Sequence, residues 1–140
     1  MNIDQSLFAV LESHKAALQK LFNRELPGMS LLYFWVLRQV GAGYGITPQL
    51  VAQKLHRDKA QVTRLVMDME QQGLLQKLPH PQDRRSILLQ LTAQGGTCLA
   101  QAEELQRQVA EKMTSGISAT QQSLLDAALQ QMRDNLNSVE

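Results

Sequence analysis

The sequence predicts a mainly α-helical domain that carries one small β-hairpin, and three observations lead to this fold class. Its core must rest on Leu, Val, Ala and Met, because aromatic residues make up only 4% of the 140 residues, and such a composition favours helices. Apolar residues recur at steps of three and four through most of the chain, the period of amphipathic helices. The period changes to two in the region of residues 75–91, where we expect strands. The length suits one domain over residues 1–140.

Two helices are expected at the start of the chain. Apolar residues from Ile3 to about Arg24 predict a long amphipathic helix. The Leu-Pro-Gly segment at 26–28 ends it, because proline disfavours helical geometry in the residue before it. Ser30 is a suitable N-cap for a second helix that runs to Val40. The second helix has few polar positions, so we expect it to lie deep in the core.

A short helix and a longer one follow, with only a brief turn between them. Thr47 caps the short helix, Pro48 suits its first position, and it ends near His56. Asp58 is expected to cap the longer helix, with Gln61 reaching back to complete a capping box. This spacing is typical of a helix-turn-helix.

The longer helix, which Gly73 ends as a left-handed C-cap, has one apolar and one polar side. The apolar stripe contains Val62, Leu65, Val66 and Met69. The polar side holds Lys59, Gln61, Thr63, Arg64 and Asp68. Because Arg and Lys neutralise phosphates or read guanine, and Gln and Thr read base edges, this side suits the major groove of DNA. Taken alone, the helix is equally consistent with an ordinary solvated polar face.

A basic hairpin is expected after this helix. Two short alternating segments, beginning at Leu75 and at Ile87, flank a polar tip that contains Asp83, Arg84 and Arg85. A tip of this kind fits an arginine into a narrow minor groove, although a solvated turn is the alternative. The formal charge of residues 54–85 is +3 and that of the remainder is −2, an asymmetry that the overall value of +1 conceals.

Two further helices complete the chain. Thr92 caps the first, which Gly116 interrupts, and Ser118 with Gln121 forms a capping box for the last. The first helix of the chain and these two carry more apolar surface than a small winged helix-turn-helix core can cover. We therefore predict a homodimer built from residues 1–26 and 96–140, with residues 30–95 forming a DNA-binding lobe.

Several classes of function are not expected. His14, His56 and His80 lie on three separate elements without metal-ligand spacing or a nucleophile in a recognisable motif. We therefore expect no enzyme, no metal site and no cofactor. A single cysteine, Cys98, fits a reducing compartment, and on an apolar stripe it is more often inert packing than a redox sensor. The sequence lacks a secretory signal and a membrane span, so we expect a cytoplasmic location.

The order of elements, together with three motifs, resembles the MarR family of bacterial transcriptional regulators. Residues 59–66, Lys-Ala-Gln-Val-Thr-Arg-Leu-Val, are similar to the recognition helix of that family, and residues 70–75 are similar to its exit into the wing. The most specific match is the wing signature, Asp83-Arg84-Arg85-Ser86 followed by Leu89-Gln90-Leu91-Thr92 and then Gly95. The likeness is strong from Lys54 to Gly95 and topological outside that range.

The resemblance implies a repressor that binds a near-palindromic operator as a homodimer. Arg85 would then reach the minor groove, Asp83 would hold it in place, and Arg84 would contact the backbone. The full set of expected DNA-binding residues is Lys54, Arg57, Lys59, Gln61, Thr63, Arg64, Asp83, Arg84 and Arg85. A winged-helix module that binds protein instead of DNA is the alternative, because the fold does not fix the function.

The resemblance also implies a small-molecule effector bound between the dimerisation helices and the lobe. Candidates for the lining of such a cleft are His14, Tyr33, Trp35 and Arg38, although Tyr and Trp on an apolar face are more often plain core. One departure from the family pattern concerns the helix after the wing. Gly96 directly follows Gly95, which we expect to loosen the start of that helix.

Overall fold

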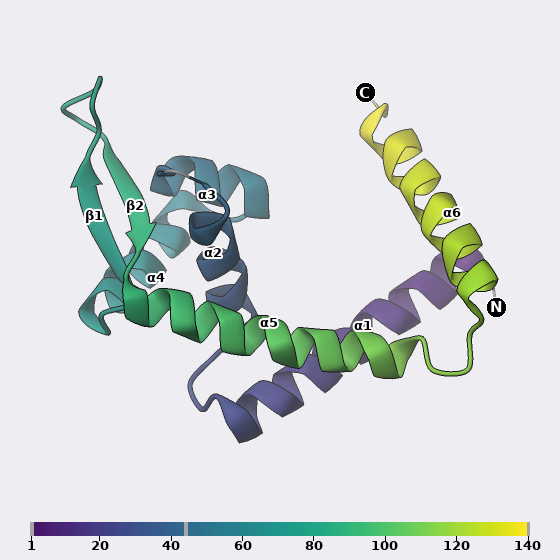
Figure 1. Cartoon of the computed structure of the whole chain (residues 1–140). Coiled ribbons are helices and arrows are strands. Elements are labelled where there is room, and N and C mark those ends of the chain that lie inside the picture. Colours follow the sequence, from purple (N-terminus) through teal and green to yellow (C-terminus); the bar gives the residue numbers. More distant parts are fainter. Residues whose placement is uncertain (1, 44, 140) are drawn as a thin grey trace.

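The computed structural model describes residues 2–43 and 45–139, and within these ranges the chain forms six helices and two strands (Figure 1). The predicted fold class, mainly α with a small hairpin, is confirmed. In chain order the elements are α1 (Ile3–Glu25), α2 (Leu31–Gly41), α3 (Pro48–Leu55), α4 (Lys59–Gln71), β1 (Leu75–Pro79), β2 (Ile87–Leu91), α5 (Ala93–Met113) and α6 (Ala119–Asn137).

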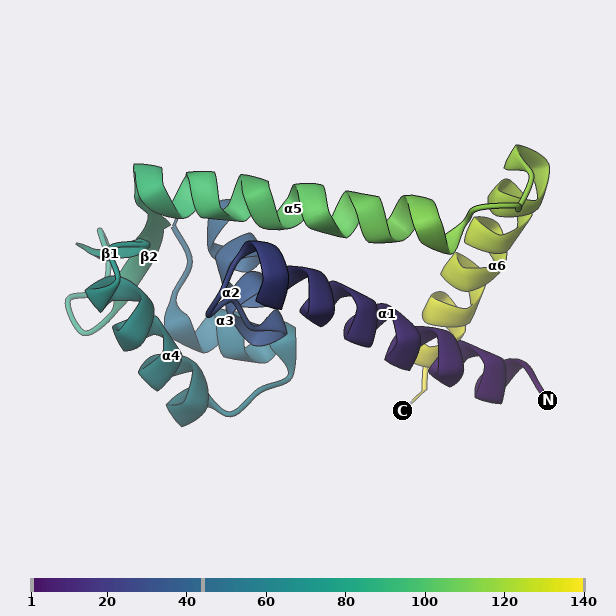
Figure 2. The same cartoon turned by 90° about the horizontal axis from the view of Figure 1, so that it is seen from below.

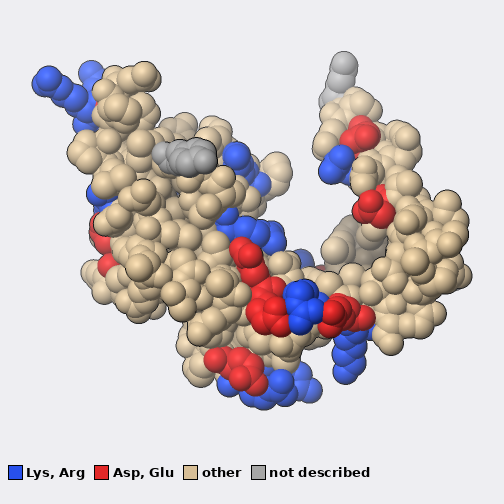
Figure 3. All heavy atoms as spheres, in the orientation of Figure 1, with Lys and Arg blue, Asp and Glu red and all other residues tan. Residues whose placement is uncertain are grey.

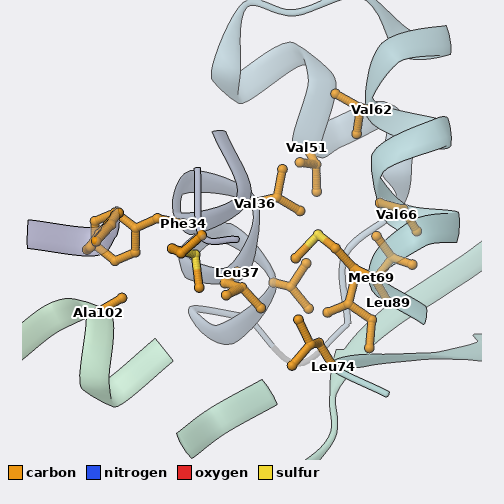
Figure 4. Close-up of a cluster of buried hydrophobic side chains, with 14 of the residues drawn as sticks. Phe34, Val36, Leu37, Val51, Val62, Val66, Met69, Leu74, Leu89 and Ala102 are labelled. Atoms are coloured by element: carbon orange, nitrogen blue, oxygen red, sulfur yellow. The ribbon is translucent and has the colours of Figure 1, made fainter. Parts of the chain in front are cut away.

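The core lies where α1, α2, α3, α4, the hairpin and α5 meet, and Figure 4 shows part of it. Helix α2 is the centre of this core, as its apolar composition predicts, since Phe34, Val36 and Leu37 are fully buried. Each buried side chain of this size contributes about 1.5–3 kcal/mol to folding. The surrounding elements supply Val51, Val62, Val66, Met69, Leu74, Leu89 and Ala102.

Strands β1 and β2 form an antiparallel wing in which Leu75 lies opposite Leu91 and Pro79 opposite Ile87. Figure 1 shows the connecting tip extending beyond the helices. A long-range contact that local patterning did not predict anchors the base of the wing. The Leu89 N–H donates to the Ile46 carbonyl at 2.8 Å, which ties the segment before α3 to β2.

Most of the predicted caps are confirmed. Ser30 accepts a hydrogen bond from the Tyr33 N–H at 3.0 Å, and Thr47 accepts one from Leu50 at 3.2 Å. The predicted capping box of α4 is wrong. Asp58 occupies the N-cap position with extended backbone, but its side chain makes no capping bond. The Asp58 side chain is exposed and Gln61 is partly buried along the helix, and N–H groups at an exposed helix end do not require a side-chain cap.

Glycine permits α5 to approach the turn between α4 and β1. A Cβ on Gly95 would lie 2.0 Å from the carbonyl oxygen of Leu74, so no larger residue fits. Thr92 reinforces the contact: its hydroxyl donates to the Gly73 carbonyl at 2.6 Å and accepts from the Gly95 N–H at 3.0 Å. Gly73 has a φ of +79°, which confirms the predicted C-cap. Helix α5 is continuous from Ala93 through Gly96, and the loosening expected from Gly96 stays a prediction.

The long helices leave much apolar surface uncovered. Helices α1 and α5 lie side by side. Helix α6 follows α5 at the end that is farther from the lobe (Figures 1 and 2). None of the residues of α6, all of which the structure describes, is buried. Leu124 and Leu136 are 67% and 69% exposed, and Phe8 of α1 is 57% exposed. Among the described residues, no helix combines the length and the hydropathy that a membrane crossing requires.

Candidate nucleic-acid interface

Helices α3 and α4 form the predicted helix-turn-helix. His56 makes the turn with a left-handed φ of +53°, and the Arg57 N–H donates to the Ala52 carbonyl at 2.9 Å. Val51 of α3 and Val62 of α4 are both fully buried, so the two helices share one apolar contact region. The opposite side of α4 is consequently left facing solvent.

The solvent face of α4 contains most of the residues that the sequence places there. Lys59, Thr63 and Arg64 are exposed, whereas Gln61 is only partly exposed. Met67 is 48% exposed on the same face, and the sequence analysis did not identify it. The signal was its position four residues after Thr63, which places both side chains one above the other on a helix. The face therefore combines cations and a hydroxyl with an apolar group able to contact a thymine methyl.

At the wing tip, Asp83 holds the backbone of Arg85 and not its side chain. A carboxylate oxygen of Asp83 accepts a hydrogen bond from the Arg85 N–H at 3.0 Å. In the described part of the chain, Asp83 makes no ion pair with Arg84 or Arg85. Both arginines are exposed, and Figure 3 shows basic side chains projecting from the tip. Asp83 thus closes a turn in which both guanidinium groups are left without an ion pair, and its role in positioning Arg85 on DNA stays a prediction.

The cations of the lobe are mostly free of acidic partners. Among the described residues of positions 54–85, Lys77 alone forms an ion pair, with Glu70 at 3.4 Å. Arg57 differs from the others, because its guanidinium lies over the Trp35 ring, 6.0 Å from the ring centroid. Within residues 54–85, the remaining basic side chains, which face solvent without an ion pair, are Lys54, Lys59, Arg64, Arg84 and Arg85.

The arginine of α5 is arranged differently. Arg107 pairs with Glu104, with a nitrogen-oxygen distance of 2.6 Å, and with Glu111 on the other side. Figure 3 shows the resulting alternation of acidic and basic atoms over this helix. Hydrogen bonding from Arg107 lowers the pKa of Glu104 to about 2. The charge of Arg107 is therefore largely neutralised by its own helix.

The four candidate effector residues do not converge on one site. His14 and Arg38 line a cavity of about 450 Å³ between α1, α2 and α5, together with Glu103, Gln106, Arg107 and Ala110. Tyr33 lies elsewhere, and its hydroxyl accepts a hydrogen bond from the Gln72 amide at 3.3 Å. Trp35 packs against the core and carries Arg57. His14 and Arg38 thus share a cavity, whereas Tyr33 and Trp35 pack against the core of the lobe.

Cys98 is partly buried against the core at the start of α5. Burial raises the pKa of its thiol, which keeps the sulfur protonated and weakly nucleophilic at neutral pH. The described geometry therefore favours the packing interpretation of this cysteine.

A helix-turn-helix followed by a two-stranded wing, with unpaired cations on both, defines a winged helix-turn-helix protein. Comparisons with known proteins show which family and which relatives the chain is similar to. Residues 28–86 match the model of the MarR family. The HTH-type transcriptional regulator YdgJ of Bacillus subtilis is 31% identical over 88 residues, which cover 63% of this chain but only 54% of that protein. PecS of Dickeya dadantii is 28% identical over 121 residues, covering 86% of this chain and 73% of that protein.

Solved structures agree over a longer range. The apo form of MarR from Escherichia coli superposes with a TM-score of 0.81 at 21% identity, covering 94% of this chain and 97% of the other. FabT of Streptococcus pneumoniae, solved in complex with DNA, gives a TM-score of 0.86 at 19% identity, covering 99% and 97%. Over residues 28–86 the chain is thus similar to the MarR family, and its relative PecS is a transcriptional regulator.

Proposed function

We propose that this chain is a repressor that binds a near-palindromic operator as a homodimer in the bacterial cytoplasm. The observation that carries the proposal is the set of exposed cations on α4 and the wing, which have no acidic partner among the described residues. Neutralising phosphates requires such unpaired cations, because a cation already paired to a carboxylate gains little from DNA. A mutant of E. coli MarR has been solved with operator DNA, and its fold matches this chain with a TM-score of 0.79.

The two DNA-facing elements have different tasks in this proposal. Helix α4 enters the major groove, where Arg64, Thr63 and Gln61 read base edges. Arg85 enters the adjacent minor groove from the wing, in the turn that Asp83 holds. Phosphate contacts by Lys54, Arg57, Lys59 and Arg84 supply the salt-dependent part of the affinity.

The exposed apolar faces of the long helices support the homodimer. Leu125 and Leu129 are 48% and 40% exposed on one side of α6, and Val10 and Leu11 of α1 are 50% and 42% exposed. Surface of this kind is covered in water by a partner, and a second copy provides the same apolar faces. A two-fold axis through these helices presents two copies of α4 to half-sites about 34 Å apart, which requires a near-palindrome.

The cavity at His14 and Arg38 is the proposed site of a small-molecule effector. It lies where α2 of the lobe meets α1 and α5, so its contents contact both parts of the molecule. Imidazole and guanidinium groups suit a ligand that carries an acidic group. Such a ligand changes DNA affinity only if it binds one spacing of the two lobes better than another.

A second candidate function is a winged-helix module that binds protein. It is favoured by three exposed apolar side chains on the lobe: Leu50, Met67 and Leu78 are 40%, 48% and 37% exposed. They lie on three different elements, α3, α4 and β1. Scattered apolar residues are normal on protein surfaces, whereas a protein-binding hot spot requires a cluster, so we place DNA first.

Selection of genomic DNA fragments by the purified protein tests the proposal. The protein is incubated with fragments, including the region upstream of its own gene, in the presence of excess unrelated DNA and at increasing salt. We expect a competitor-resistant complex whose affinity falls steeply with salt. Failure to select any fragment, with binding that unrelated DNA removes, would refute the operator and favour the protein-binding alternative.

A further inference from the structure

The tip of the wing is held by hydrogen bonds that converge on one histidine. Nδ1 of the partly buried His80 accepts hydrogen bonds from the N–H groups of Gln82 and Asp83, each at 3.1 Å. The Ser86 N–H in turn donates to the Asp83 carbonyl at 3.2 Å, and the Asp83 carboxylate accepts from the Arg85 N–H. One ring nitrogen therefore organises the segment that presents Arg84 and Arg85.

This arrangement requires a neutral imidazole. A ring nitrogen accepts hydrogen bonds only while it carries no proton, so the bonded form has its single proton on Nε2. When the ring takes up a second proton, Nδ1 becomes a donor and faces two backbone donors. The two hydrogen bonds to Nδ1 are then lost.

We propose that His80 is a positioning residue for the wing, and that protonation of its ring releases the turn that presents Arg84 and Arg85 to DNA. The proposal rests on the DNA-binding role of the wing argued above. It gives the protein a device by which protonation of a single ring weakens operator binding.

The charged groups near the tip are few. Asp83, Arg84 and Arg85 belong to the same turn, and Lys77 of β1 is paired with Glu70 of α4. Simple electrostatics predicts the opposite pH effect, because a protonated histidine beside DNA adds attraction to the phosphates. The sign of the pH dependence therefore separates a positioning role from a mere surface charge.

Two variants of His80 test the proposal on a short duplex carrying the fragment selected by the wild-type protein. His80→Asn keeps a side-chain oxygen that accepts from the N–H groups two and three residues on, and it does not titrate. His80→Ala removes the acceptor at every pH. At about pH 7.5 we expect wild type and His80→Asn to bind alike, and His80→Ala to bind about five- to tenfold more weakly.

The pH profile provides the readout that a structural role alone would not change. Between about pH 7.5 and pH 5.5 we expect the wild type to lose about five- to tenfold in affinity relative to His80→Asn. Because His14 and His56 are present in both proteins, their titration cancels in this ratio. A ratio that stays constant or rises on acidification would overturn the proposal, as would an undiminished affinity of His80→Ala at neutral pH.

An Arg85→Ala variant separates failure of this inference from failure of the proposed function. If Arg85→Ala binds weakly while the His80 variants bind normally at every pH, the wing contacts DNA and His80 does not position it. If Arg85→Ala also binds as tightly as the wild type, the wing does not contact DNA and the proposed function is wrong in that part. Thermal unfolding of each variant checks that the lobe remains folded.

Discussion

The lobe and the terminal helices have the same kind of amphipathic pattern, but their apolar faces differ in how far the chain itself covers them. In α2, Phe34 and Leu37 are fully buried, because α1, α3, β2 and α5 pack against that helix. In α6, Leu124 and Leu136 are 67% and 69% exposed. Helical periodicity therefore predicts which face of a helix is apolar. The tertiary structure decides whether the same chain covers that face.

The two regions also use their charges differently. Arg64 and Arg85 of the lobe point into solvent without an acidic partner among the described residues, whereas Arg107 of α5 is held between Glu104 and Glu111. A sequence count treats these arginines alike. Their surroundings make the first two available to a polyanion and the third a stabiliser of its own helix.

The largest expected effect comes from placing charge on the uncovered face of α6. Leu125→Asp combined with Leu129→Asp would bury two unpaired carboxylates in the proposed dimer interface. We expect the dimer dissociation constant to rise more than about 100-fold, and operator affinity to fall with it because the two half-sites are no longer linked. Sedimentation equilibrium measures the first effect, and a gel-shift titration measures the second.

Ser123→Asp is the matched control for this experiment. Ser123 lies on the opposite side of α6 from Leu125 and Leu129, so the same charge should leave the dimer intact. Equal weakening by Ser123→Asp would show that charge anywhere on α6 is harmful. An unaltered dimer in the double variant would show that this face is not the interface.

The contact between the lobe and α5 is tested by a pair of neighbouring glycines. Gly95→Ala places a Cβ against the Leu74 carbonyl, so the turn must shift, and we expect a loss of about 1–3 kcal/mol in the free energy of unfolding. Gly96→Ala has nothing within 4 Å of its new Cβ and should stabilise by about 0.5–1 kcal/mol. Urea denaturation measures both changes in the free energy of unfolding. Two changes of the same sign would contradict a close contact at Gly95 and open space at Gly96.

Removing an unpaired cation from α4 should affect binding and not folding. We expect Arg64→Ala to weaken operator binding by about 1–3 kcal/mol if the side chain reads a base edge. Arg24→Ala, which removes an exposed arginine paired with Glu25 at the end of α1, should change the affinity little. Fluorescence anisotropy with a labelled operator measures both variants, and an unchanged affinity for Arg64→Ala would count against α4 as the recognition helix.

The smallest effect concerns the paired charges of α5. The pKa of Glu104 is about 2 in the native protein, and Arg107→Ala should raise it towards the ordinary value near 4.3. A carboxyl group whose pKa is lower in the native protein than in the unfolded chain stabilises the fold at pH values above its unfolded pKa. This contribution is lost as the pH falls through the native pKa. Both side chains are about half exposed, so solvent screens the pair and the change in stability should be small. Carboxyl-carbon NMR titration tests the pKa directly, and a normal pKa in the wild type would contradict the pairing.

Local signals predicted most of the fold. The caps at Ser30, Thr47 and Thr92, the C-cap at Gly73 and the two strands of the wing depend on residues close together in sequence, and the structure confirms them. The exception is Asp58, because a capping sequence permits the bond without requiring it. The bridge between Ile46 and Leu89 was not predictable, since it joins segments that only the tertiary fold brings together.

The candidate site was predictable in its residue types but not in its contacts. Polar positions of an amphipathic helix are identifiable from its period, so Lys59, Thr63 and Arg64 were found. Met67 and His80 were missed as functional residues, the first because apolar residues are normally assigned to the core. The second was missed because accepting two backbone N–H groups depends on turn geometry. That Asp83 binds the backbone of Arg85, and that Arg57 lies over Trp35, required coordinates.

We would first measure the mass of the protein, both alone and bound to its selected operator. This measurement tests whether one region recognises DNA while the other joins two copies. Light scattering or sedimentation should give twice the mass of one chain in solution. On the operator, one duplex should bind two chains, and the double α6 variant should appear as a monomer with weak affinity. A single chain that binds the operator tightly by itself would contradict the account.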